Sequence, residues 1–264
     1  MFENQSAPPP GFVWLVGAGP GAADLITVRG IRALQQAEVV LHDDLAGREL
    51  LNYCPPKTEF IYVGKRAGGH SASQDEINWL LVSHAQAGRR VVRLKGGDPS
   101  VFGRLGEELQ ALRVAQISFE VVPGITAACA AAAAAGISLT QRGIASAAIL
   151  ATGHECAEKT GPSLDWEKLA RPGTTLCVYM GTRRLGELAG RLVAQGHSPH
   201  TPLLIISNAS LPTQIIRTGT LETATELAAD AEGTPSLILV GEIAAQNRAL
   251  LAVHHRPERT HVAV

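Results

Sequence analysis

Continuous apolar runs alternate with segments of helical period along this chain, and that alternation constrains its fold more than any other feature. Five apolar runs in the first half are typical of buried strands, at residues 12–19, 38–43, 59–65, 89–97 and 118–124. Segments of helical period separate them, at residues 24–37, 74–88, 102–115 and 126–136. Strands that alternate with helices and are apolar throughout predict βαβ units and a mostly parallel sheet with both faces buried.

The pattern restarts after Thr140, which suggests a second α/β domain. Its expected strands lie at residues 147–153, 174–181, 202–208, 214–219 and 236–242, with helices around 184–195 and 222–230. We therefore expect a flexible arm over residues 1–11, an N-terminal α/β domain over 12–139, a C-terminal α/β domain over 140–245 and a flexible tail over 246–264.

Composition excludes several classes of protein. The chain has 264 residues, 45% hydrophobic and 18% charged, with a net charge of -1, so we expect a sizeable core and no binding of nucleic acid or membrane. The start has no basic and apolar leader, and the longest apolar stretch, residues 125–139, is too short to span a bilayer. Four cysteines at no metal-ligand spacing predict buried thiols, no metal site and a cytoplasmic location.

The first glycine-rich turn, "VGAGPG" at residues 16–21, is a poor match to a dinucleotide-binding fingerprint. Ala22 stands where the third glycine belongs, and Pro20 removes a backbone donor that would face a phosphate. A tight strand-to-helix turn is as good an interpretation as ligand contact. An NAD-dependent oxidoreductase therefore stays an alternative, although these two departures argue against it.

Three further turns could hold a ligand. In "GGDP", Gly96 and Gly97 let the backbone approach a ligand, and Asp98 offers an acceptor at the carboxyl end of a strand, although a plain β-turn has the same composition. Thr126 either caps the next helix or precedes free N–H groups. Met180 in "YMG" is either core filler or a soft contact.

Positive charge is concentrated in one part of the chain. Between Lys57 and Arg113 there are nine Lys and Arg against six Asp and Glu, a balance of +3. A solvated surface explains this as readily as a cleft for an anionic ligand. Arg93 and Lys95 alternate with apolar residues on a predicted strand, so the direction of their side chains stays open.

Six sequence blocks together resemble the tetrapyrrole methylase family. They are "VWLVGAGPGAADLITVRG", "YVGKRAG", "VVRLKGGDPSVFGR", "VPGITAA", "LTQRGIAS" and "VYMG", and the resemblance runs from Val13 to Ala244. It implies two α/β domains of the tetrapyrrole methylase type, a homodimer, and S-adenosyl-L-methionine (SAM) in the cleft between the domains. It also implies a small-molecule tetrapyrrole substrate, uroporphyrinogen III, methylated at two ring carbons to give precorrin-2, the entry to sirohaem, cobalamin and haem d1, with S-adenosyl-L-homocysteine as by-product.

The resemblance also implies the residues of the site. Contacts with SAM fall on Pro20, Gly96, Gly97, Asp98, Val101, Thr126, Ala127, Met180 and Ala209. Substrate-binding positions match Arg104, Glu107 and Arg142, and arginine suits carboxylates because its fork donates two parallel bonds. The family's proton acceptor and donor match Asp43 and Lys65, which could instead form an ion pair flanking the sheet. Arg104 is a third catalytic candidate, assigned mainly to orienting carboxylates.

Five positions depart from the family's usual residues and put fine substrate preference in doubt. They are His42 for tyrosine, Ser100 for an aromatic residue, Ser138 for proline, Gln141 for histidine and Ala209 for glycine. Two alternatives within reach of the same fold therefore stay open. One is a methyltransferase acting on a later precorrin, and the other is a SAM-binding regulator without catalysis.

Overall fold

The computed structural model describes residues 11–64, 72–154, 164–169 and 171–246. The arm expected before Phe12 and the tail expected after Ala245 lie almost wholly outside the described residues. The chain divides into two compact units, Met1–Ala130 and Ala131–Val264, each described here by itself. This division falls within the alanine-rich helix, earlier than the boundary near Thr140 that the sequence suggested.

Unit 1 is built on a five-stranded sheet in which all neighbouring strands are parallel. The strand order is β3-β2-β4-β1-β5, with bounds β1 Phe12–Gly17, β2 Val39–His42, β3 Glu59–Tyr62, β4 Val91–Lys95 and β5 Ser118–Val122. The helices are α1 Val28–Leu34, α2 Gln74–Gln86 and α3 Leu105–Val114, with 3-10 turns η1 Ala23–Leu25 and η2 Arg48–Tyr53, and α4 Ala127–Ala135 begins in unit 1 and ends in unit 2. The parallel sheet expected from the sequence is therefore present.

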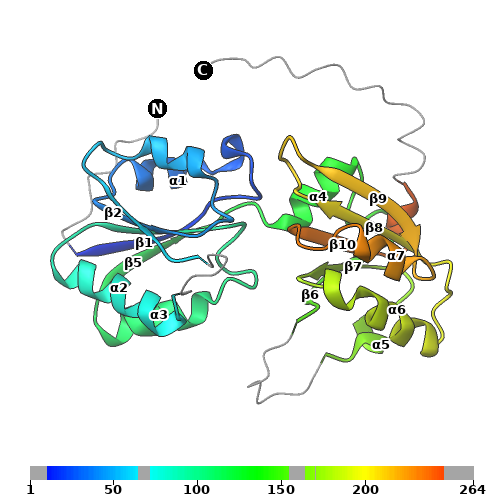
Figure 1. Cartoon of the computed structure of the whole chain (residues 1–264). Coiled ribbons are helices and arrows are strands. Elements are labelled where there is room, and N and C mark those ends of the chain that lie inside the picture. Colours follow the sequence, from blue (N-terminus) through cyan, green and yellow to red (C-terminus); the bar gives the residue numbers. More distant parts are fainter. Residues whose placement is uncertain (1–10, 65–71, 155–163, 170, 247–264) are drawn as a thin grey trace. The chain divides into compact units, whose positions relative to one another are not determined.

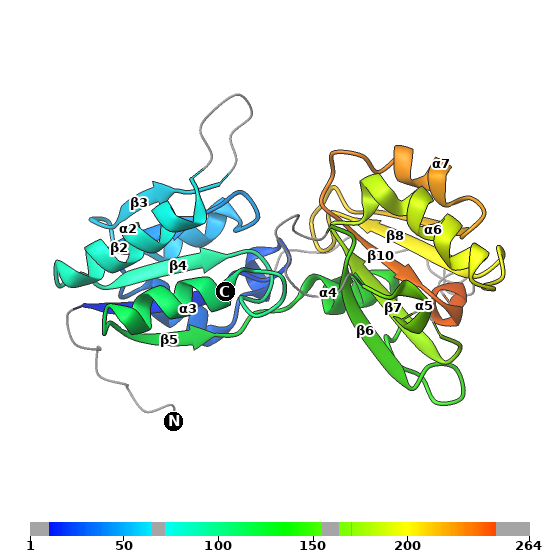
Figure 2. The same ribbon diagram turned by 90° about the horizontal axis from the view of Figure 1, so that it is seen from below.

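Helices cover both faces of this sheet, with α1 on one face and α2 and α3 on the other (Figure 1). Figure 2 views the unit from the side of α2 and α3, which lie in front of the strands. The alternating residues of β1 show why its sequence is apolar throughout: Trp14 and Val16 join the cluster that includes Leu34 of α1, whereas Val13 and Leu15 join Leu81 of α2. Each such buried side chain contributes about 1.5–3 kcal/mol.

Two helices begin later than the sequence pattern predicted. The helix expected from residue 24 is interrupted after η1, and α1 starts only at Val28, where the Thr27 hydroxyl accepts the Gly30 N–H at 3.1 Å. The helix expected from residue 102 starts at Leu105, because Phe102 and Arg104 adopt left-handed backbone conformations with φ of 52° and 54°. The apolar periodicity of the sequence does not reveal either of these late helix starts.

Unit 2 contains a mixed sheet, an arrangement that the sequence pattern did not distinguish from a parallel one. The strand order is β6-β7-β10-β8-β9, with bounds β6 Ala147–Thr152, β7 Thr174–Tyr179, β8 Pro202–Ser207, β9 Ile215–Thr220 and β10 Ser236–Val240. Only β6 and β7 pair in parallel. The link over residues 208–214 is too short for a crossover helix, so β9 returns antiparallel to β8.

The helices of unit 2 are α5 Trp166–Leu169, α6 Leu185–Ala194 and α7 Ala224–Ala229, with 3-10 turns η3 Thr182–Arg184 and η4 Glu242–Ala245. Leu185 and Leu192 of α6 and Ala224 of α7 pack with Leu176 and Ile205 of the sheet in one apolar cluster. Within the described residues, no helix has both the length and the apolar character needed to cross a membrane.

The cysteines are only partly as expected. Cys177 on β7 is buried, Cys54 is half-buried with burial raising its thiol pKa to about 11, and Cys156 lies outside the described residues. Cys129 was expected to be buried but is exposed. The buried residues of α4 are Ala128, Ala130, Ala131, Ala132 and Ala135, whereas Cys129 between two of them faces outward.

Candidate functional site

The carboxyl ends of all five strands of unit 1 meet at one edge of its sheet, because the strands are parallel. The turns that follow β1, β4 and β5 are the three glycine-rich segments singled out in the sequence, and Asp43 follows β2. Ligands of open α/β sheets bind at such an edge. The fold of unit 1 thus gathers residues from distant parts of the sequence into one candidate site.

Three glycines allow the turns after β1, β4 and β5 to touch backbone to backbone. A Cβ on Gly17 would lie 2.6 Å from the Gly124 nitrogen, and one on Gly124 would lie 2.2 Å from the Gly97 oxygen. Gly19 and Gly97 exchange N–H···O bonds of 3.2 and 2.7 Å. Gly97 itself has φ of 69° and open space where its Cβ would stand, so a ligand could approach its backbone closely.

Asp98 ties two of these turns together. One carboxylate oxygen accepts the N–H and the hydroxyl of Ser100, and the other accepts the Gly124 N–H at 3.0 Å. Partial burial acts to raise the pKa of Asp98, but these hydrogen bonds outweigh it and hold the pKa below its ordinary value. Asp98 therefore has a structural role in the turn, while its contact with SAM stays a prediction.

The "PSVFGR" segment after Asp98 is held in an unusual backbone conformation. Left-handed conformations at non-glycine residues such as Phe102 and Arg104 cost on the order of 1–3 kcal/mol each and are frequent at functional sites. A Cβ on Gly103 between them would lie 2.6 Å from the Pro99 oxygen. The conformation presents Phe102 as an exposed aromatic ring beside Arg104.

Arg104 and Glu107, both predicted to bind substrate, form a two-pronged ion pair at the start of α3. The bonds are Nε to Oε1 at 2.8 Å and Nη2 to Oε2 at 2.7 Å, and both side chains are about half exposed, at 59% and 48%. The Arg104 hydrogen bond holds the pKa of Glu107 below its ordinary value. An exposed pair of this kind contributes only about 0–1 kcal/mol, so Arg104 can exchange this partner for another carboxylate.

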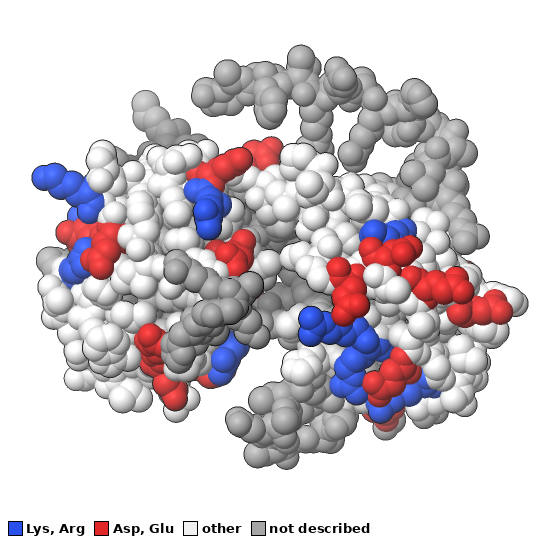
Figure 3. Space-filling view, in the orientation of Figure 1, with Lys and Arg blue, Asp and Glu red and all other residues white. Residues whose placement is uncertain are grey.

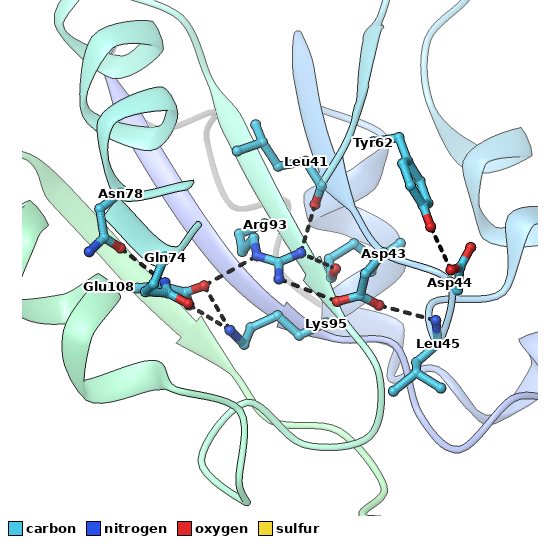
Figure 4. A network of polar contacts seen from close by, with 11 residues as sticks. Leu41, Asp43, Asp44, Leu45, Tyr62, Gln74, Asn78, Arg93, Lys95 and Glu108 are labelled. Carbon is cyan, nitrogen blue, oxygen red and sulfur yellow. Dashed lines mark hydrogen bonds and ion pairs between the residues drawn. The ribbon is translucent and has the colours of Figure 1, made fainter. Parts of the chain in front are cut away.

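Asp43 lies at the same edge and joins a buried polar network (Figure 4). It accepts the Leu45 N–H at 3.1 Å and the Arg93 guanidinium at 3.3 Å. Arg93 also contacts Glu108, which in turn binds Lys95. The structure pairs Asp43 with Arg93. Lys65 lies outside the described residues, so the ion pair between Asp43 and Lys65 that the sequence suggests as one alternative stays a prediction.

The Arg93–Glu108–Lys95 cluster is the main feature that sequence reasoning missed. Arg93 and Lys95 both point to the face of the sheet covered by α2 and α3, and Glu108 on α3 has no exposed surface. The available signal was a pair of cations two residues apart on an apolar strand, followed by "EE" in the next helix. Pairing across more than ten residues could not be deduced from that signal alone.

At the equivalent edge of unit 2, two predicted cofactor contacts follow strands. Met180 follows β7 with φ of 53° and is 56% exposed, so it is not core filler. Ala209 follows β8 between two residues with left-handed backbones, Asn208 and Ser210. The strands β7 and β8 run in the same direction because each is antiparallel to β10, so both turns lie at one edge.

The remaining predicted residues lie on turns. Pro20 is partly exposed in the turn after β1, while Thr126 and Ala127 stand at the start of α4, where the Thr126 carbonyl accepts the Ala130 N–H. Val101 donates its N–H to the Asp98 carbonyl at 3.2 Å. Arg142 is exposed in unit 2, in a turn closed by hydrogen bonds between residues 141 and 145. None of these positions excludes its assigned role.

The departures from the family's residues have structural partners of their own. His42, where the family has tyrosine, is buried edge-on against Tyr62 at 5.7 Å between ring centroids, and burial lowers its pKa. Ser100, where an aromatic residue is usual, donates its hydroxyl to Asp98. The Ser138 hydroxyl donates to the Thr140 carbonyl, and Gln141 closes the turn that carries Arg142.

Among the described residues, the cations between Lys57 and Arg113 are mostly paired with acids or buried rather than gathered in one surface patch. Acidic and basic side chains are interspersed on the face drawn in Figure 3. Arg89 pairs with Glu59 and Arg90 with Glu38, while Arg93 and Lys95 are buried. The charge balance therefore gives less support to an anionic ligand than the ion-pairing of Arg104 does.

Unit 2 has a separate cavity of about 240 Å³. Gly153 and Gly181 line it beside Trp166, Arg184 and Arg191. The two arginines share Glu187 as an ion-pair partner. No residue predicted for the site lines this cavity, and its charged groups already neutralise one another in part.

By class, unit 1 is an α/β domain with glycine-rich turns and acidic side chains at the carboxyl edge of a parallel sheet. The description "Tetrapyrrole (Corrin/Porphyrin) Methylases" belongs to the family profile that matches residues 13–225. The chain belongs to this family.

Solved structures of the same fold match nearly the whole chain. The uroporphyrin-III-C-methyltransferase of Thermus thermophilus is 39% identical with a TM-score of 0.74, over 91% of this chain and 98% of that one. A structure of the Thermus enzyme complexed with S-adenyl homocysteine is 38% identical with a TM-score of 0.73, over 88% and 92%. A cobalt precorrin-4 methyltransferase also has a TM-score of 0.74, at 28% identity over 88% and 95%.

Curated relatives are longer proteins. The siroheme synthase of Zymomonas mobilis subsp. mobilis is 50% identical over 240 residues, which are 91% of this chain and 50% of that protein. The chain thus spans about half the length of the curated relatives it matches.

Proposed function

We propose that this chain is a SAM-dependent methyltransferase that methylates uroporphyrinogen III at two ring carbons, giving precorrin-2 for sirohaem biosynthesis. The observation that carries the proposal is the carboxyl edge of unit 1, where the open Gly97 backbone lies next in sequence to Asp98 and at the same edge as Asp43. Identity of 39% to the Thermus methyltransferase over nearly its whole length supports the same conclusion.

The residues of this edge fit SAM. Gly97 leaves room for a ligand against the backbone, and Asp98 retains acceptor capacity beyond its three hydrogen bonds. Pro20 lacks a backbone donor, which suits a sulfonium better than a pyrophosphate. Gly96, Val101, Thr126 and Ala127 in unit 1, and Met180 and Ala209 in unit 2, complete the set that we propose to hold it. When bound, SAM supplies an electrophilic methyl group.

Arg104 and Arg142 are the residues that we propose to hold the carboxylates of the substrate. Arg104 is half exposed and paired weakly enough with Glu107 to exchange partners. Glu107 then keeps the guanidinium of Arg104 oriented while a substrate carboxylate accepts hydrogen bonds from some of its N–H groups. Arg142 is exposed on its turn, which leaves its side chain accessible for the same role. Orientation of the reacting carbon can supply about 7–11 kcal/mol of the barrier reduction.

Asp43 is the proposed proton acceptor. A pyrrole carbon that has gained a methyl group leaves its ring cationic, so a proton must depart before the ring regains neutrality. A positioned carboxylate at this step contributes roughly 10²–10⁴-fold. Lys65, the proposed donor, lies outside the described residues.

The rival functions have less support. An NAD-dependent oxidoreductase needs a helix that begins at the glycine-rich turn, but here η1 follows that turn and α1 begins only at Val28. A methyltransferase for a later precorrin shares the fold, since the cobalt precorrin-4 enzyme has the same TM-score of 0.74, but its identity is 28% against 39%.

The experiment that separates these rivals is a parallel incubation. The purified chain is given methyl-labelled SAM and, in separate anaerobic reactions, uroporphyrinogen III or the monomethylated or dimethylated precorrin. Label should enter uroporphyrinogen III and the monomethylated precorrin, but not the dimethylated one. Label entering only the dimethylated compound would overturn the substrate assignment, and binding of NADH without binding of SAM would overturn the class of enzyme.

We further infer a homodimer in the cytoplasm. Strand β6 is an edge strand with exposed Ala147, Ala148 and Leu150, an apolar surface suited to a second copy. The thiols Cys54, Cys129 and Cys177 are free, which is typical of a reducing compartment. Light scattering at the mass of a monomer, near 27.7 kDa, would contradict the dimer.

A further inference from the structure

A buried network of four charged side chains lies directly behind the edge that carries Asp43 (Figure 4). Lys95 donates to both oxygens of Glu108 at 2.8 and 2.7 Å, and Arg93 donates its Nε to the same carboxylate at 3.2 Å. Arg93 then reaches Asp43 through Nη2 at 3.3 Å. Two cations and two carboxylates thus form one neutral chain from α3 across β4 to the end of β2.

Three of the four charged side chains in this network are buried. Glu108 is 0% exposed, and Arg93 and Lys95 are 6% and 4% exposed. A buried charge without partners is strongly destabilising, and a buried ion pair by itself is seldom a net gain in stability over apolar residues. A network retained at this depth is therefore better explained by what it positions than by the stability it adds.

The geometry of Arg93 shows what it positions. Its Nη1 donates to the backbone carbonyls of Leu94 at 3.0 Å and Leu41 at 3.4 Å, while Nε is held by Glu108. The guanidinium plane is therefore fixed from β2, β4 and α3 before it meets Asp43. Asp43 has one further anchor, the Leu45 N–H on its other oxygen. The carboxylate is thus clamped between one backbone donor and one rigid side-chain donor.

We propose that Arg93 is a positioning residue that fixes the carboxylate of Asp43 for proton transfer, with Glu108 and Lys95 holding Arg93 in place. The inference rests on the proposed function, since it assigns Arg93 a role through Asp43. Arg93 has no part in binding substrate, because it is buried and its donors are occupied by Glu108, Asp43 and the two carbonyls.

Within the part of the chain that the structure describes, the charged groups near Asp43 do not hold its carboxylate as Arg93 does. Asp44 is held by the Tyr62 hydroxyl. His42, adjacent on β2, is buried, and the charge of Arg48 in η2 helps to lower the pKa of His42. Burial lowers the pKa of Lys95, and Glu108 opposes that effect only in part. Lys95 donates to both carboxylate oxygens of Glu108, so among the described residues Arg93 is the cation that forms an ion pair with Asp43.

A double-mutant cycle on the full chain tests the proposal. The four proteins are wild type, Arg93→Met, Asp43→Asn and the double variant. Arg93→Met leaves Lys95 and Glu108 as a neutral pair, so the chain should still fold. We expect Arg93→Met to lower kcat about tenfold or more with little change in the KM for the tetrapyrrole, and to lower it less than about twofold further when Asp43 is already Asn.

Two companion variants keep a structural role distinct from positioning. Arg93→Lys retains the charge but loses the fork, and should recover only part of the lost kcat. Arg90→Met removes a half-buried arginine that pairs with Glu38 just before the same strand, and should leave kcat unchanged. An equal loss of kcat in Arg93→Met and in Arg90→Met would overturn the proposal.

The same four proteins also separate failure of this inference from failure of the proposed function. Equal kcat losses for Arg93→Met in the presence and absence of Asp43, or no effect of Asp43→Asn in an active enzyme, would overturn the positioning role. A wild-type chain that methylates no tetrapyrrole would overturn the proposed function instead. Thermal unfolding of the four proteins gives a second double-mutant cycle, for stability. Additive losses of stability in that cycle would show that Arg93 does not hold Asp43.

Discussion

At the residue scale, Asp98 serves the fold and the candidate site with one carboxylate. Its hydrogen bonds from Ser100 and Gly124 join the turns after β4 and β5, and its position at the carboxyl edge places it where a ligand would bind. The sequence suggested either a plain turn or a ligand contact for "GGDP". The structure shows that the turn is built around Asp98, so the two interpretations are not exclusive.

Replacement of Asp98 by alanine should therefore affect two measurements. The Gly124 N–H loses its partner, which should lower the free energy of unfolding by about 1–3 kcal/mol in urea titrations. The affinity for SAM should fall at least about tenfold by calorimetry. Unchanged affinity in a folded variant would remove Asp98 from the cofactor site and leave only its structural role.

The lowered pKa of Asp98 also predicts how stability depends on pH. A carboxyl group whose folded pKa lies below its unfolded pKa adds stability that is complete above the unfolded value and is lost as pH falls through the folded value. The free energy of unfolding should therefore decline below about pH 4. In Asp98→Asn the decline should be smaller, and an identical pH profile for both proteins would show that Asp98 does not contribute.

Arg104 should behave differently from Asp98. Arg104→Ala removes an exposed ion pair, so stability should change by less than about 1 kcal/mol. If Arg104 holds a substrate carboxylate, kcat/KM for the tetrapyrrole should fall about tenfold or more while the affinity for SAM is unchanged. Wild-type kcat/KM in Arg104→Ala would exclude the assignment. Arg113 lies on the last turn of the same helix, α3, so Arg113→Ala is the control and should leave kcat/KM unchanged.

At the element scale, glycines in the turns matter for different reasons that the structure separates. Gly17 and Gly124 allow backbones to meet, whereas Gly97 combines a left-handed backbone with open space. The sequence predicts all three as turn residues but does not say which faces a ligand. Distinguishing them requires knowing that β1 lies between β4 and β5.

Alanine at Gly97 should therefore weaken SAM binding more than its effect on stability would suggest. The left-handed backbone costs about 1–2 kcal/mol with alanine, and the new methyl group occupies the space open to the ligand. Gly190 in α6 also has open space but an ordinary helical backbone, so Gly190→Ala should stabilise the chain by about 0.5–1 kcal/mol and leave SAM affinity unchanged. Equal SAM affinities of Gly97→Ala and wild type would contradict a ligand at Gly97.

The secondary elements themselves could largely be predicted, because buried parallel strands are apolar throughout and the covering helices are amphipathic. The strand from Val91 to Lys95 fell within its predicted range despite two cations. Helix starts at Val28 and Leu105 could not be predicted, since they depend on a 3-10 turn and on left-handed residues. The partner of Arg93 could not be predicted either, because it depends on which face α3 covers.

At the scale of the whole molecule, two units contribute separate cores. The apolar cluster around Leu176 and Leu192 belongs to unit 2, and those around Trp14 and Leu81 belong to unit 1. Predicted cofactor contacts come from both units, with Met180 and Ala209 in the second. The assignment of Ala209 rests on the resemblance to the family alone, since no spacing or composition in the sequence pointed to this residue.

The most direct test of the account is a mass spectrum of the tetrapyrrole after anaerobic incubation of the purified chain with SAM and uroporphyrinogen III. The account predicts a product heavier by two methyl groups, with a singly methylated species at early times. An unmodified tetrapyrrole, from protein that is folded and binds SAM, would contradict the proposed substrate.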